Sequence, residues 1–141
     1  MSMFNFSLPL NKIRCALRLA GWCAVFAIAV LSLVPGELRP HTEMPGYFEH
    51  FSAYFIATLL LSLGHTGRFA IFLSPLLSAY AAILETIQLW VPGRGAAIMD
   101  WVSSSMGALT GAIVASVLLA AASKIGGFRK STSRSSGYYA D

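Results

Sequence analysis

The side chains that could do chemistry gather in one short, otherwise apolar stretch. Residues 83–101 read ILETIQLWVPGRGAAIMDW and carry Glu85, Gln88, Arg94 and Asp100. Glu85 and Gln88 are three residues apart, so they share one face of a helix. A carboxyl group inside an apolar span is costly and usually faces a bundle interior or a watery cavity. Glu85 is therefore a candidate for proton transfer or for binding a positive charge, whereas Gln88 could simply hydrogen-bond another helix.

A second polar group precedes this stretch. His50 and Tyr54 are one helical turn apart and share a face, while the neighbouring Glu49 is expected to point elsewhere, towards lipid headgroups. Imidazole is the side chain used most often for general acid–base chemistry. The structural alternatives are that His50 is only a solvated residue at the membrane interface and that Tyr54 only packs.

A tight turn separates Glu85 from Asp100. Its sequence is Pro92-Gly93-Arg94-Gly95, and glycines allow the backbone a positive φ. Arg94 is expected either to pair with Glu85 or Asp100, or to bind a lipid phosphate, which suits its planar guanidinium. Asp100 directly precedes the next apolar span, where an N-cap is the simplest role. Capping and ligand binding could coexist at this residue.

Composition places these residues in a membrane protein. Of the 141 residues, 56% are hydrophobic and only 11% are charged, whereas soluble domains carry about 25% charged residues. Crossing a bilayer takes about 20 mostly apolar residues. The segments that approach this length are residues 15–34, 48–63, 69–91 and 101–122. Short links with Pro and Gly join them, so the sequence predicts one all-α domain, a four-helix transmembrane bundle.

The basic residues predict the orientation of this bundle, because Lys and Arg concentrate on the cytoplasmic side. With the N-terminus inside, the inner set is Lys12, Arg14, Arg18, Arg68, Lys124, Arg129, Lys130 and Arg134, and the outer set is Arg39 and Arg94. Residues 1–14 are then a cytoplasmic segment and residues 123–141 a basic, Ser-rich cytoplasmic tail, disordered from Ser131. Both termini are predicted to be cytoplasmic, in the cell (inner) membrane.

The acidic residues have the opposite distribution. Those at or near the outer side are Glu37, Glu43, Glu49, Glu85 and Asp100, and only Asp141 lies inside. The polar residues of the 83–101 stretch are therefore expected to converge with His50 and Tyr54 on one shallow, acidic pocket at the outer leaflet. An alternative for the first span is a cleaved signal peptide, since Ala27-Ile28-Ala29 has cleavage-site spacing, although the apolar run continues to Val34.

The last span carries a face of small residues at four-residue spacing: Ser103, Gly107, Gly111 and Ala115. Such a face lets another helix approach closely, so its expected role is helix packing. Cys15 and Cys23 are about 12 Å apart along one helix, too far for a disulfide, and lack metal-type spacing. No metal or cofactor is expected. No nucleic-acid partner is expected either, since the basic residues suit anionic lipid headgroups.

The ordered set of polar motifs resembles the VanZ-like family. Its pieces here are Glu49-His50-Phe51-x-x-Tyr54, Glu85-x-x-Gln88, Pro92-Gly93-Arg94, and Asp100 followed by Gly107 and Gly111, spread over residues 45–115. The chain departs from the family pattern at two positions. The family often has Asp in the region of Glu49, and Asn at the position of Ser104. A serine hydroxyl reaches less far than an amide, so a contact made by that Asn would change here.

The resemblance implies a small multi-pass protein of the cell envelope, and the family's namesake is linked to resistance to the glycopeptide teicoplanin. The function expected on this basis is modulation of glycopeptide susceptibility, or binding of an envelope lipid or cell-wall precursor. The ligand-binding candidates are His50, Tyr54, Glu85, Gln88, Arg94, Asp100 and Ser104.

Binding is favoured over catalysis because the sequence has no nucleophile elbow, no HExxH motif and no Cys–His pairing. The alternative functions are an enzyme that acts on a lipid-linked envelope substrate and a structural partner in an envelope complex. Ion transport is a weaker alternative, since no second acid or His lies near the bilayer centre. The sequence leaves the oligomeric state open.

Overall fold

The computed structural model describes residues 10–38, 44–65 and 68–135, and over these ranges the chain is helical without strands. In chain order the elements are α1 (Leu10–Leu33), the short 3-10 helix η1 (Gly36–Leu38), α2 (Gly46–Gly64), α3 (Arg68–Gln88) and α4 (Ile98–Ser135). The predicted all-α, four-helix bundle is confirmed.

The helices differ from the predicted spans mainly at their ends. Helix α1 begins at Leu10, so it takes in Lys12 and Arg14, whose long side chains can reach water from a helix end. Helix α4 continues through the glycine pair at residues 126–127 to Ser135, because a helical glycine costs only about 1 kcal/mol. Arg39, Glu43 and residues 136–141 lie outside the described residues.

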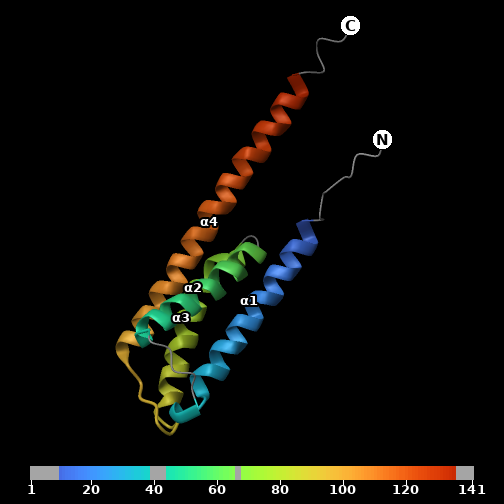
Figure 1. Ribbon diagram of the computed structural model, residues 1–141. Helices are drawn as coiled ribbons and strands as arrows, with labels where there is room; N and C mark the ends of the chain where they lie inside the picture. Colours follow the sequence, from blue (N-terminus) through green and yellow to red (C-terminus); the bar gives the residue numbers. More distant parts are fainter. Residues whose placement is uncertain (1–9, 39–43, 66–67, 136–141) are drawn as a thin grey trace.

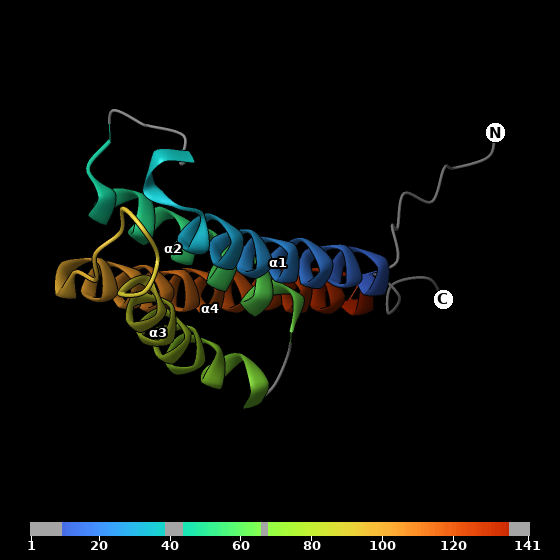
Figure 2. The same cartoon turned by 90° about the horizontal axis from the view of Figure 1, so that it is seen from below.

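Three helices of the described chain are long and apolar enough to cross a membrane: Leu10–Leu33, Phe69–Gln88 and Ile98–Lys124. These spans agree with a multi-pass membrane protein. Helix α2 is not among these spans; it is the shortest of the four α-helices described, and Glu49 and His50 lie near its start. It contacts each of the other helices and passes between α1 and α4 (Figures 1 and 2). The other helices therefore cover much of α2.

The interior of the bundle is built from small and hydroxyl-bearing residues. Its buried members include Ala57, Thr58, Ala81, Ser104, Ala108 and Ala115, whereas Phe26, Ile71 and Phe72 are more than half exposed. This distribution is typical of helices in lipid, where association depends on close backbone packing and not on removing apolar surface from water.

Helix α4 meets α2 along its small-residue face. A Cβ added at Gly107 would collide with the Phe51 carbonyl oxygen, and one at Gly111 would lie 2.6 Å from the Phe55 carbonyl oxygen. Ala115 is fully buried, and Ser103 is only half-buried while the adjacent Ser104 is fully buried. Contact between α2 and α4 at Gly107 fixes the starts of the two helices side by side.

The loops that follow α1 and α3 meet at the end of the bundle opposite the start of α1 (Figure 1). The Gly36 backbone N–H donates to the Pro92 carbonyl oxygen at 3.2 Å. Gly93 has φ +71°, a conformation that side chains disfavour. At the other end, Arg18 Nε of α1 donates to the Gly64 carbonyl oxygen at the end of α2, at 2.8 Å.

The close approach at Gly107 predicts that Gly107→Leu lowers the free energy of unfolding by about 1–3 kcal/mol, the usual cost of overpacking. The measurement is the thermal unfolding midpoint of the detergent-purified chain. Gly95→Leu is the matched control, because an added Cβ there meets no atom within 4 Å. Equal midpoints for the two variants would contradict the contact.

Candidate functional site

Three titratable side chains from three helices meet at the loop end of the bundle. His50 lies near the start of α2, Glu85 in the last turn of α3 and Asp100 in the first turn of α4. His50 Nδ1 is 3.9 Å from Glu85 Oε1, and His50 Nε2 is 3.8 Å from Asp100 Oδ2. One imidazole therefore lies between two carboxylates, an arrangement that can hold a proton or a cation.

Glu85 is held by the backbone that leads into α4. Its residue is 7% exposed, and its Oε2 accepts a hydrogen bond from the Ala97 backbone N–H at 3.1 Å. The N-terminus of a helix carries a partial positive charge, so a carboxylate is stabilised there. Burial of Glu85 is thus offset by a backbone donor, in addition to the neighbouring His50.

Asp100 does not precede α4, because the helix begins at Ile98. The N-cap position expected for Asp100 is therefore wrong: the structure places it inside the first turn, directed at His50. The backbone N–H just before the helix is bound by Glu85 instead. The Asp100 side chain is 26% exposed, against 13% for His50, so access to the cluster is from the Asp100 side.

Ser104 contacts the imidazole of His50. Its Oγ is 3.3 Å from His50 Nδ1, one helical turn after Asp100 on α4. Ser, His and Asp thus follow one another as in a nucleophilic triad. Ser104 has no exposed surface, however, so its hydroxyl cannot reach a substrate. Its role in this geometry is to orient His50.

Gln88 and Arg94 contact the end of α1. Gln88 Nε2 donates to the Ser32 carbonyl oxygen at 3.0 Å. An Arg94 guanidinium nitrogen donates to the Leu31 and Ser32 carbonyl oxygens at 2.8 and 3.1 Å. The last carbonyls of a helix have no partner within it, so these two side chains hold the end of α1 against the α3–α4 loop.

Tyr54 belongs to the core. It is 1% exposed, and its ring lies 6.5 Å from that of Tyr80, tilted by 54°. Tyr80 in turn donates its hydroxyl to the Val25 carbonyl oxygen at 3.1 Å. Of the seven residues predicted to bind ligand, the structure brings together four: His50, Glu85, Asp100 and Ser104.

Sequence reasoning missed the backbone groups that complete the site. The Ala97 N–H and the Leu31 and Ser32 carbonyls are partners of Glu85 and Arg94, and backbone groups leave no residue-type signal. It also missed that His50, Glu85 and Asp100 offer three ligand atoms within 4.8 Å of one another, a spacing that could hold a metal ion. Their positions on three separate helices hide this from any local motif.

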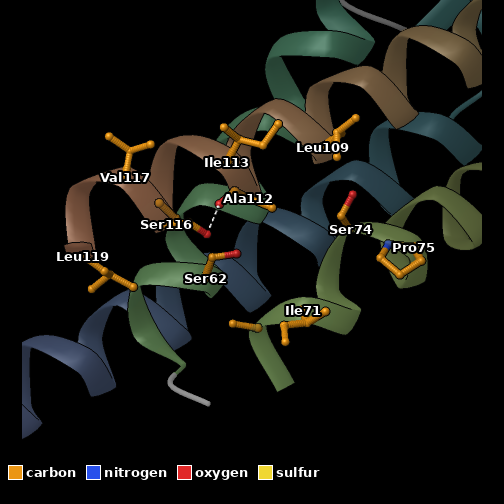
Figure 3. Close-up of a pocket in the computed structure, with 12 residues that line it drawn as sticks. Ser62, Ile71, Ser74, Pro75, Leu109, Ala112, Ile113, Ser116, Val117 and Leu119 are labelled. Atoms are coloured by element: carbon orange, nitrogen blue, oxygen red, sulfur yellow. Dashed lines mark hydrogen bonds between the residues drawn. The ribbon is translucent and has the colours of Figure 1, made fainter. Parts of the chain in front are cut away.

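An apolar groove of about 440 Å³ lies between α3, α4 and the end of α2 (Figure 3). Residues from the three helices line it, among them Ser62, Ile71, Pro75, Leu109, Ile113 and Leu119. Its Ser116 hydroxyl donates to the Ala112 carbonyl oxygen of its own helix at 2.8 Å. None of the residues that line this groove is titratable, so its surface suits a hydrocarbon chain.

Comparison of the chain with protein-family models, curated proteins and solved structures found no match. The resemblance to VanZ-like proteins therefore stays a prediction based on the motifs quoted above.

The contacts of Arg94 predict that Arg94→Ala lowers the free energy of unfolding by about 1–3 kcal/mol, because two hydrogen bonds from a charged donor are lost, one of them to the Leu31 carbonyl at the helix end. The thermal unfolding midpoint in detergent measures this. Lys12→Ala removes an exposed cation from the opposite end of α1 and is the control. An Arg94→Ala midpoint no lower than that of the control would show that these bonds do not stabilise the bundle.

Proposed function

We propose that this chain is a VanZ-like membrane protein that binds the positively charged polar part of an envelope amphiphile at the His50, Glu85 and Asp100 cluster. The amphiphile is an envelope lipid, a lipid-linked cell-wall precursor or a glycopeptide of the teicoplanin type. The observation that carries the proposal is the convergence of one imidazole and two carboxylates between apolar helices. Such groups are costly in lipid and usually serve function.

The charge of the cluster supports a cationic partner. Two carboxylates face one imidazole, so the site attracts positive charge at neutral pH. Arg94, expected either to pair with Glu85 or Asp100 or to bind a lipid phosphate, donates to carbonyl oxygens at the end of α1. The amphiphile would therefore present an amine, or another positive group, to Glu85 and Asp100.

The surroundings of the cluster support an amphiphilic partner. The exposed side of the bundle is apolar, and the groove in Figure 3 lies between the same two helices, at residues 70–75 of α3 and 109–119 of α4, further along both helices from Glu85 and Asp100. A ligand that stays in the bilayer can place its hydrocarbon part against these helices and its polar part at the cluster. Apolar contact and a few convergent polar groups are the usual composition of a ligand site.

The distribution of charge supports an outer-leaflet position for the site. Lys12, Arg14 and Arg18 lie on α1 at the end away from the cluster, and Lys124 lies on the part of α4 that extends towards that same end (Figure 1). Because basic residues mark the cytoplasmic side, the cluster would face the outside of the cell membrane, where cell-wall precursors and glycopeptides meet.

Catalysis on a lipid-linked substrate is the second candidate, and it would depend on His50 alone. An imidazole between two carboxylates is a competent proton acceptor. The buried hydroxyl of Ser104 supplies no accessible nucleophile, so the reaction would need a water or substrate nucleophile.

The test is teicoplanin susceptibility of a sensitive Gram-positive host that expresses wild type, His50→Ala or Glu85→Gln at matched membrane levels. We expect wild type to raise the minimal inhibitory concentration at least about fourfold and both variants to lose most of this protection, since removing one buried charged partner costs about 2–5 kcal/mol of binding. Glu37→Gln is the control, because Glu37 is an exposed acid in η1 at the same end.

Two results would contradict the proposal. If wild type matches the empty vector, and envelope lipids extracted from the purified chain are the same for wild type and Glu85→Gln, the cluster binds neither class of amphiphile. If Glu37→Gln abolishes protection as fully as Glu85→Gln, general surface charge and not the cluster explains the effect. Altered envelope lipids that depend on His50 would favour catalysis instead.

A further inference from the structure

We propose that the positive charge held by His50, Glu85 and Asp100 is a single divalent transition-metal ion, with Zn²⁺ the best fit. Each of the three residues offers one ligand atom, and these atoms lie within 4.8 Å of one another. Two carboxylate oxygens this close repel each other. An ion between them removes the repulsion and is bound by the imidazole as well.

The donor set selects the class of metal. Imidazole nitrogen suits Zn²⁺ and its neighbours in the first transition row, whereas Mg²⁺ and Ca²⁺ prefer oxygen ligands alone. Three protein ligands with a fourth, open position are typical of zinc sites that hold water or an exogenous ligand. The 26% exposed side chain of Asp100 marks the side on which that position would open.

Neighbouring groups already orient the ligands. A metal-bound histidine usually donates its other ring N–H to a fixed acceptor. Ser104 Oγ lies 3.3 Å from His50 Nδ1, so with the proton on Nδ1 the Nε2 lone pair is directed to the Asp100 side. The Ala97 N–H holds Glu85 Oε2 and leaves Oε1 on the side of His50.

The described separations are wider than those around a bound ion. Tetrahedral zinc with bonds of about 2.0 Å keeps its ligand atoms about 3.3 Å apart, whereas Nε2 and Asp100 Oδ2 are 3.8 Å apart. His50 Nδ1 and Glu85 Oε1 are 3.9 Å apart, and all three ligand atoms lie within 4.8 Å of one another. Side-chain rotations of the partly exposed Asp100 and of His50 would therefore have to bring the ligands together around an ion. The first turn of α4 need not move, because Ala97 is already fixed to Glu85.

The inference rests on the same side chains as the proposed function, and it names the cation that they hold. A bound ion would contact the polar part of the amphiphile through its open fourth position, in place of a direct contact between an amine and the two carboxylates. Metal binding is measured without any amphiphile, however, and antibiotic susceptibility without added metal. Failure of one proposal is therefore distinguishable from failure of the other.

The experiment is calorimetric titration of the full chain, purified in detergent and stripped with a chelator, with ZnCl₂ and separately with MgCl₂. We expect one Zn²⁺ per chain and no measurable Mg²⁺ binding. His50→Ala and Asp100→Asn should each weaken Zn²⁺ binding at least about 100-fold, and Ser104→Ala about 10-fold, as for loss of an outer hydrogen-bond partner. His65→Gln should leave it unchanged, since His65 Nδ1 lies 3.0 Å from the Leu61 carbonyl oxygen at the far end of α2.

A second readout keeps the test independent of the variants' folding. Zn²⁺ should raise the thermal unfolding midpoint of wild type and of His65→Gln, but not that of Asp100→Asn, with helicity and monodispersity checked for each chain. No zinc uptake by wild type would overturn the proposal. Equal zinc affinity in wild type and Asp100→Asn would also overturn it, because the ion would then bind elsewhere.

Discussion

A carboxylate buried between apolar helices must be satisfied from within the bundle, and the loop end of this protein is arranged around that requirement. Lipid supplies no donor, and an unpaired charge there is costly. Glu85 is met by the Ala97 N–H at the start of α4 and by the imidazole of His50. Glu85 thus connects the end of α3 to the beginnings of α2 and α4. The other polar contacts surround this junction of Glu85, His50 and Ala97.

Close packing of small residues makes the junction possible. His50 and Ser104 can meet only if the starts of α2 and α4 lie side by side, and contact between α4 and the α2 backbone at Gly107 brings them there. The same constraint removes Ser104 from solvent. The arrangement that orients the imidazole is therefore also the reason that this serine cannot serve as a nucleophile.

Helix α1 is joined to the junction by polar side chains at its end. Gln88 and Arg94 both donate to the Ser32 carbonyl oxygen, and the loop after α1 donates from Gly36 to Pro92. These contacts satisfy carbonyls that a helix end leaves open. They also place the α3–α4 loop, which carries Ala97, in register with Glu85. Gln88 and Arg94, which the sequence predicted to bind ligand, thus hold in place the helix end and the loop beside the site.

The sequence by itself determined the helices and the end of the bundle at which the polar groups lie. Apolar spans separated by Pro and Gly predict four helices, and one-turn spacing places Glu85 with Gln88 and His50 with Tyr54 on shared faces. It did not predict that α1 begins at Leu10 or that α4 begins at Ile98. The start of α4 depends on the Glu85 carboxylate, which binds the Ala97 N–H from the end of another helix.

Only the tertiary structure decided which polar residues form the cluster. Residues on a shared helical face were separated: Tyr54 entered the core, and Gln88 turned to α1. Residues on different helices were joined: His50, Glu85 and Asp100 came within reach of one ion. Spacing along a helix fixes only the side of the helix from which a side chain projects. The partner of that side chain depends on how closely the next helix approaches. That approach was decided by the glycines of α4 and by backbone groups that carry no signal in the sequence.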